Sequence, residues 1–126
     1  MDVGIMAPLL LARGFLPQMV SAQRGHVINL SGTFGSGARG WIHYFVSKKA
    51  LEHLTIGLAD EVRAAKIQVN CISPADVATD AVIRFFPEDA ASALQPDDVV
   101  EIARWLLSPA ARHISGQIIE VRNRDA

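Results

Sequence analysis

The most regular feature of the sequence is a helical spacing of apolar residues. Apolar side chains recur three and four positions apart over 42–65, and similar patterns mark 5–22 and 96–107. These three segments are predicted to be helices, and the first of them is expected to be buried. A further short helix is expected near 81–86, within a region of weaker periodicity.

Three short, largely apolar segments predict strands at 26–30, 67–73 and 117–121. The segment 31–40 holds four glycines and small polar residues, which predicts a loop. The order helix, strand, helix, strand, helix, strand predicts an α/β fold, a partial Rossmann-like, three-layer α/β/α arrangement around a parallel sheet. Three parallel strands have two open sheet edges, so we expect something to cover them.

Composition narrows the class of protein. The 126 residues suit one domain spanning 1–126. A formal net charge of -1 provides no basic surface for nucleic acid or an anionic membrane. The single cysteine, Cys71, excludes an intramolecular disulfide and is interpreted as a small buried apolar residue. The four histidines show no metal-ligand spacing, so no metal site is predicted.

The apolar run at 3–12 resembles the core of a signal peptide in length. However, Asp2 stands where such a peptide carries positive charge, and no small-residue cleavage site follows cleanly. The run is also shorter than the roughly 20 apolar residues of a membrane-spanning helix. We therefore interpret it as part of a buried helix and expect a cytoplasmic protein.

Candidate chemistry is concentrated between the first strand and the second long helix. Tyr44 and Lys48 are four residues apart, so they share one face of that helix. A free tyrosine has a pKa of about 10 and is a poor base at neutral pH, but a nearby ammonium group favours the phenolate. Ser31 ends the first strand, where ligands bind in open α/β sheets, and its hydroxyl could stabilise charge on a substrate oxygen. Spacing alone favours an ordinary structural role for the pair.

The surrounding residues change that interpretation. The run HVINLSGTFGSGARGWIHYFVSKKAL at 26–51 closely resembles the active-site segment of the short-chain dehydrogenase/reductase family. In that family a serine ends one strand and a Tyr-x-x-x-Lys pair follows thirteen residues later, as Ser31 and Tyr44 do here. VNCISP at 69–74 and the tail from Pro96 to Gln117 resemble later segments of the same family, so the resemblance covers essentially the whole chain.

The resemblance implies a hydride transfer between NAD or NADP and an alcohol or carbonyl substrate. It implies that Tyr44 is the general acid–base, that Ser31 orients and polarises the reacting oxygen, and that Lys48 stabilises the phenolate and binds the nicotinamide ribose. Tyr44 and Lys48 would thus also contact the cofactor, together with Pro74, Val77 and Thr79 on its carboxamide and diphosphate side. Neither the substrate nor the preference for NAD or NADP can be deduced from the residues present.

Three aromatic residues could line a substrate pocket beside the tyrosine, or could equally be packing residues. They are Phe34, Trp41 and Phe86.

The sequence also departs from the family pattern. It contains no strand, glycine-rich turn and helix that would bind dinucleotide phosphates, so we expect a truncated, catalytic half of the fold. Gly4 falls near a helix asparagine that connects a proton relay in the family, and Ala75 replaces the usual glycine after Pro74.

Three interpretations therefore stay open. The chain could be an oxidoreductase, a catalytically idle family member that acts as an oligomerisation or interaction module, or the product of an incomplete reading frame. Because helices at 5–22 and 42–65 correspond to those that commonly form the family's four-helix dimer interface, a homo-oligomer through them is expected.

Overall fold

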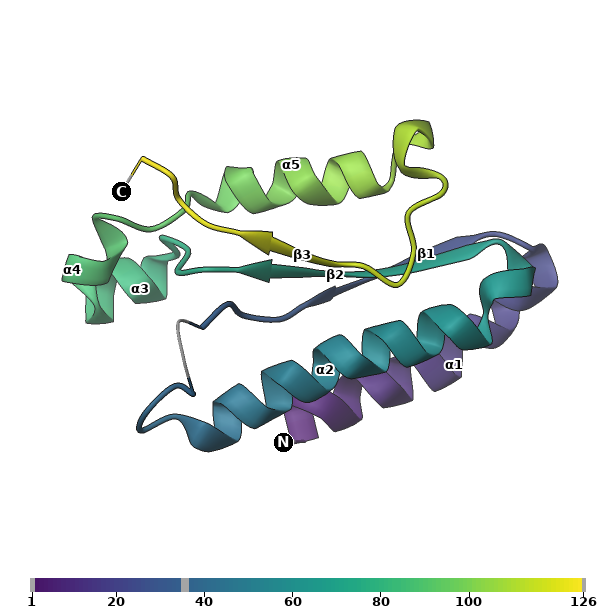
Figure 1. Cartoon of the computed structure of the whole chain (residues 1–126), viewed down its shortest axis with the longest axis horizontal. Helices are drawn as coiled ribbons and strands as arrows, with labels where there is room; N and C mark the ends of the chain where they lie inside the picture. The colour runs from purple at the N-terminus through teal and green to yellow at the C-terminus, as the bar shows by residue number, and fades with distance from the viewer. Residues whose placement is uncertain (1, 35–36, 126) are drawn as a thin grey trace.

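Three parallel strands form the centre of the protein. The computed structural model describes residues 2–34 and 37–125. Strands β1 (Gly25–Leu30), β2 (Ile67–Pro74) and β3 (Ile118–Val121) pair in the order β1-β2-β3 (Figure 1). β2 is the middle strand, and its Val69, Cys71 and Ile72 are fully buried, as expected for a parallel strand covered on both faces.

Helices cover both faces of this sheet. α1 (Ala7–Ala22) and α2 (Ile42–Glu61) lie on one face, and α5 (Pro96–Leu106) lies on the other (Figure 1). Two short helices, α3 (Asp80–Phe85) and α4 (Pro87–Ala90), lie near the carboxyl ends of the strands. The predicted three-layer α/β/α fold is therefore confirmed. The remaining turns are η1 (Asp2–Met6), η2 (Arg63–Ala65) and η3 (Pro109–Ala111).

The position of α2 over the sheet follows from its sequence. Leu51, Thr55 and Ala59 are four residues apart and buried, so they form one stripe that faces the strands. Thr55 Oγ1 donates to the carbonyl of Leu51 at 2.9 Å and accepts from Asn29 Nδ2 at 3.0 Å. This polar contact fixes the helix against β1 at the level of its middle turns.

The connection between α5 and β3 is tied to β2 by side-chain amides. Gln68 Nε2 donates to the carbonyls of Ala111 and Ile114, and Asn70 Nδ2 donates to Ile114 at 3.0 Å. Asn70 Oδ1 accepts from the backbone of Gln117 at 3.1 Å. These contacts satisfy buried polar groups and set the register of β3.

The start of the first helix and the end of the second differ from the predicted positions. The first helix has regular α geometry only from Ala7, after the π-helical turn η1, and the long second helix ends at Glu61 instead of 65. η2 follows it, and Lys66 then takes a left-handed φ of 61° that turns the chain into β2. The predicted loop over 31–40 has no helix or strand in its described part, and its residues 35–36 lie outside the described residues.

The expectation of a buried first helix was wrong. Among the described residues of α1 only Ala12 is buried, and Leu11 is 59% exposed. The continuous helical stretch Gly4–Ala22 has 19 residues and is apolar enough, by length and composition, to cross a membrane, a test that a signal sequence or a core helix also passes. β1 is an edge strand, with β2 as its one neighbour among the described strands.

Candidate active site

The carboxyl ends of β1 and β2 form the base of the candidate site. Beyond β1 the backbone continues to pair, because Ser31 N donates to Ile72 O and Thr33 N donates to Pro74 O, each at 2.9 Å. The Thr33 hydroxyl also bonds to the carbonyl of Ser73. The segment 31–33 is therefore held rigidly beside the end of β2, in the crevice where open parallel sheets bind ligands.

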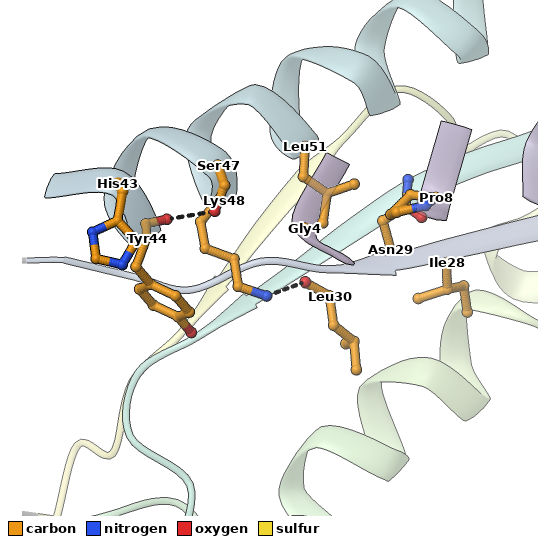
Figure 2. A pocket seen from close by; sticks show the side chains of 10 residues that line it. All are labelled: Gly4, Pro8, Ile28, Asn29, Leu30, His43, Tyr44, Ser47, Lys48 and Leu51. Carbon is orange, nitrogen blue, oxygen red and sulfur yellow. Dashed lines mark hydrogen bonds between the residues drawn. The ribbon is translucent and has the colours of Figure 1, made fainter. Parts of the chain in front are cut away.

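Tyr44 and Lys48 lie together on the first turns of α2, as predicted. Figure 2 shows both side chains extending toward the end of β1, where Lys48 Nζ donates to the carbonyl of Leu30 at 3.2 Å. The ammonium lies 5.5 Å from the centroid of the Tyr44 ring. Tyr44 is 43% exposed, and within 2–34 and 37–125 its hydroxyl makes no hydrogen bond. The phenol is thus accessible to a ligand and has a positive charge beside it.

Ser31 is placed differently from the other two candidates. Its side chain is directed into the protein, and the residue is 6% exposed. Ser31 Oγ donates to Glu52 Oε2 at 2.5 Å, and the carbonyl of Lys48 lies 3.2 Å from the same hydroxyl. Glu52 is itself buried, and Lys49 Nζ lies 3.4 Å from its Oε1. The serine hydroxyl is therefore already bonded to a charged acceptor on α2.

Gly32 is the residue next to the tyrosine hydroxyl. A Cβ atom placed on Gly32 would lie 3.8 Å from Tyr44 Oη and 3.7 Å from the nearest ring atoms of Phe34. These are ordinary van der Waals distances, so the wall of the site at this point is backbone.

The proposed cofactor residues gather around one small cavity of about 280 Å³. Its lining includes Ser31, Tyr44, Pro74, Val77 and Thr79. The backbone near Val77 is held by a bridge to Leu94, and Thr79 caps α3, its Oγ1 accepting from Val82 N at 3.3 Å. Lys48 and Tyr44 both line a second, larger cavity of about 730 Å³, whose lining residues Figure 2 shows.

The three aromatic candidates also come together. Phe34, Trp41 and Phe86 line a cavity of about 450 Å³ with Tyr44. The ring of Phe34 meets Tyr44 edge to face at 5.8 Å, and Trp41 meets it at 6.5 Å. Asp76 and Asp89 line the same cavity, so its wall combines aromatic faces with two carboxylates. Tyr44 borders all three cavities.

Glu52 and Gly32 were missed by the sequence reasoning. The alternation of side chains along a strand was the available signal, because residues 29 and 31 must point to one side of the strand and residues 30 and 32 to the other.

The buried carboxylate of Glu52 also affects a thiol in the core. Burial first, and the charge of Glu52 second, raise the pKa of the Cys71 thiol to about 11. Cys71 is thus an inert, buried thiol, as expected.

The two single-residue departures from the family pattern, Gly4 and Ala75, differ in their structural effect. A Cβ atom on Gly4 would lie 3.0 Å from both Cβ and Oγ of Ser47, so a larger residue does not fit there without movement. Ala75 causes no such difficulty. It does not lie in the left-handed region, and its N–H donates to the carbonyl of Val121 at 2.8 Å.

A parallel sheet with helices on both faces defines a partial Rossmann-like α/β protein, and here a tyrosine–lysine pair lies at its carboxyl edge. The family description "short chain dehydrogenase" matches residues 1–90. The chain therefore belongs to the short-chain dehydrogenase family, which confirms the family resemblance of the sequence.

Individual relatives agree with this assignment. The uncharacterized oxidoreductase YmfI of Bacillus subtilis is 30% identical over 127 residues, which cover 93% of this chain and 52% of that protein. A 3-oxoacyl-[acyl-carrier protein] reductase from Brucella melitensis, solved with bound NAD, has a TM-score of 0.78 at 30% identity, covering 95% of this chain and 48% of that one.

A Beutenbergia cavernae protein solved with bound NADP at low occupancy has a TM-score of 0.86 at 28% identity, over 96% of this chain and 53% of that one. The chain thus spans about half the length of the relatives that it matches.

Proposed function

We propose that this chain carries the proton-transfer residues of an NAD(P)-dependent oxidoreductase that acts on an alcohol or carbonyl substrate. The observation that supports this proposal is the position of Tyr44. Tyr44 is 43% exposed and lines three cavities, and the Lys48 ammonium lies 5.5 Å from the centroid of its ring.

The roles of the two side chains follow from their chemistry. Tyr44 Oη donates its proton to a carbonyl oxygen in reduction and accepts a proton from an alcohol in oxidation. The Lys48 ammonium stabilises the phenolate that remains after donation. Among the described residues the ammonium donates to one acceptor, the carbonyl of Leu30, and an ammonium has two further N–H groups that a ribose hydroxyl or water could accept from.

The residues present fit the nicotinamide and ribose end of a dinucleotide. When bound, this cofactor supplies or accepts the hydride. Tyr44 and Lys48 offer hydroxyl and ammonium donors on one side of the crevice. Thr79 offers a hydroxyl hydrogen on the other side, because its oxygen accepts from Val82 N and its own hydrogen can still be donated.

The affinity of the chain for the whole cofactor should be low. A glycine-rich phosphate-binding turn does not occur in its 126 residues, so charge-assisted contacts to the phosphates are not supplied by this chain. We expect dissociation constants weaker than micromolar. Bound NAD and NADP in the two solved relatives support the class of cofactor and leave the preference open.

The test is a fluorescence titration of the folded chain with NADH and with NADPH. Tyr44→Phe is the matched variant, because it removes one hydroxyl and keeps the ring contacts with Phe34 and Trp41. A Tyr44→Phe, Lys48→Ala variant removes both polar groups. Saturable binding that weakens in both variants supports the proposal. Absence of binding up to millimolar cofactor, from a chain shown to be folded, contradicts it.

A second candidate function is an oligomerisation module, with the catalytic residues idle. The specific observation that favours it is the uncovered apolar face of α1, where a hollow is lined by apolar side chains and one arginine: Leu9, Ala12, Arg13, Leu16, Pro17, Val20 and Leu58. We propose that copies of the chain associate through α1 and α2, the helices predicted at 5–22 and 42–65.

Light scattering coupled to size-exclusion chromatography tests this association. A dimer or larger assembly that dissociates in a Leu9→Asp, Leu16→Asp variant agrees with the proposal. A monomer at all concentrations tested contradicts it.

A further inference from the structure

The direction of side chains after β1 decides which residue faces the tyrosine. Side chains alternate along a strand, so Asn29 and Ser31 point to the same side. Both reach α2, since Asn29 Nδ2 donates to Thr55 Oγ1 and Ser31 Oγ donates to Glu52 Oε2. Ser31 is thus the second polar anchor of β1 against this helix.

The contact between Ser31 and Glu52 is a buried, short hydrogen bond that holds α2 against the segment after β1. Its donor is 6% exposed and its acceptor 7% exposed, and the two atoms are 2.5 Å apart. Hydrogen bonds to a buried carboxylate are short and strong. If one is broken, the carboxylate stays buried without a donor, and its desolvation penalty is no longer compensated. Turning the Ser31 hydroxyl toward a substrate would therefore leave Glu52 Oε2 without this donor, and the Lys49 ammonium lies 3.4 Å from the other carboxylate oxygen, Oε1.

A side chain at position 32 would point toward Tyr44, whereas that of Ser31 points toward Glu52. A Cβ atom on Gly32 would lie 3.8 Å from Tyr44 Oη, and a hydroxyl one bond further out would come within hydrogen-bond range of it. The nearest other atoms are 3.7 Å away in the flexible ring of Phe34, so a small side chain fits. Gly32 is also not in the left-handed region of φ, so the backbone tolerates a replacement.

We propose that residue 32, and not residue 31, faces the reacting oxygen beside Tyr44, and that Ser31 is a positioning residue that holds α2 through Glu52. The catalytic part of this statement rests on the proposed function. In this arrangement neither residue 31 nor residue 32 offers Tyr44 a partner hydroxyl, and the identity of residue 32 determines what a substrate oxygen meets opposite the phenol.

The first experiment reads the environment of Tyr44 directly and needs no turnover. Because Tyr44 is the one tyrosine in the chain, ¹³C-labelled tyrosine gives a single Cζ signal. The spectra of Gly32→Ser, Gly32→Ala and Ser31→Ala are compared with that of the parent. We expect Gly32→Ser to move the signal more than Gly32→Ala does, and more than Ser31→Ala does.

A shift from Ser31→Ala that equals or exceeds the shift from Gly32→Ser overturns the proposal. If Ser31→Ala does not fold, Ser31→Cys, which keeps the size of the side chain and weakens its donor, takes its place. The positioning role is tested by a double-mutant cycle in urea unfolding. Ser31→Ala should destabilise the parent clearly more than it destabilises a Glu52→Gln background; equal losses in both backgrounds overturn the positioning role.

The catalytic part is tested with cyclohexanone and NADH or NADPH. We expect Gly32→Ser to raise kcat/KM about tenfold or more, because a preorganised donor to a developing charge is commonly worth that much. Equal or lower turnover in Gly32→Ser overturns this part. If the parent chain shows no turnover, the proposed function fails, and the Tyr44 signal and the unfolding cycle still decide between positions 31 and 32.

Discussion

The buried thiol of Cys71 links the stability of the fold to pH, and its effect can be calculated. Cys71 is fully buried on β2, and burial together with the charge of Glu52 raises its pKa from 9.0 to about 11. Below pH 9 the thiol is protonated in the folded and the unfolded chain, so it adds no pH dependence. Between pH 9 and 11 the unfolded chain loses this proton while the folded chain retains it. Stability therefore falls as the pH rises through this window.

The size of the fall follows from the two pKa values. A difference of one pKa unit corresponds to 1.36 kcal/mol, so a rise from 9.0 to about 11 corresponds to roughly 3 kcal/mol once the pH exceeds 11. This is a large share of the 5–15 kcal/mol that typically stabilises a domain. The effect should be visible in equilibrium unfolding.

The assay is urea unfolding at pH 8, 9, 10 and 11 for the parent and for Cys71→Ala. Every other ionisable group is present in both proteins, so the difference between the two curves isolates the thiol. Alanine costs a constant amount through the cavity that it leaves. We expect the parent to lose about 2 kcal/mol relative to Cys71→Ala between pH 9 and 11, with the remainder of the fall above pH 11. Parallel curves would refute the reasoning.

Two further changes test the packing around the site. Gly4→Asn should destabilise the fold by about 1 kcal/mol or more, because its Cβ meets Ser47 at 3.0 Å, and adding Ser47→Gly should recover most of the loss in a thermal melt. Thr55→Val should cost about 1–3 kcal/mol in urea unfolding, because it leaves Asn29 Nδ2 without its acceptor. Replacing Asn29 with leucine as well should restore part of that stability, and no recovery would count against the contact as its cause.

Much of the fold could be predicted from the sequence because its signals are local. The strand at 67–73 was recognisable as a short segment rich in Ile and Val that stops at Pro74, and α5 from Pro96 and the acidic residues of its first turn. The burial of α1 could not be predicted in this way. Apolar periodicity shows that a helix has an apolar face, but not whether a partner covers that face, and most of α1 is uncovered here.

In the site, too, the features set by neighbouring residues could be predicted, and those set by residues distant in sequence could not. The spacing of Tyr44 and Lys48 requires one helix face, and the structure places them there. The direction of Ser31 depends instead on Glu52, which lies 21 residues further along the chain. A motif identifies which residue types are present near a site, but the partner of each hydroxyl depends on tertiary packing.

The position of the tyrosine depends on three polar contacts between α2 and β1. Lys48 Nζ bonds to the carbonyl of Leu30, Ser31 bonds to Glu52, and Asn29 bonds to Thr55. All three lie on the same helix as Tyr44 and on the segment that ends at the crevice, and none of them involves a ligand. The geometry of the phenol and the ammonium is therefore fixed by this chain before any cofactor binds. Weak cofactor binding and an ordered Tyr44–Lys48 pair are therefore compatible in the same molecule. A dissociation constant above micromolar would reflect the missing phosphate contacts, whereas no binding up to millimolar NADH would contradict the proposed function.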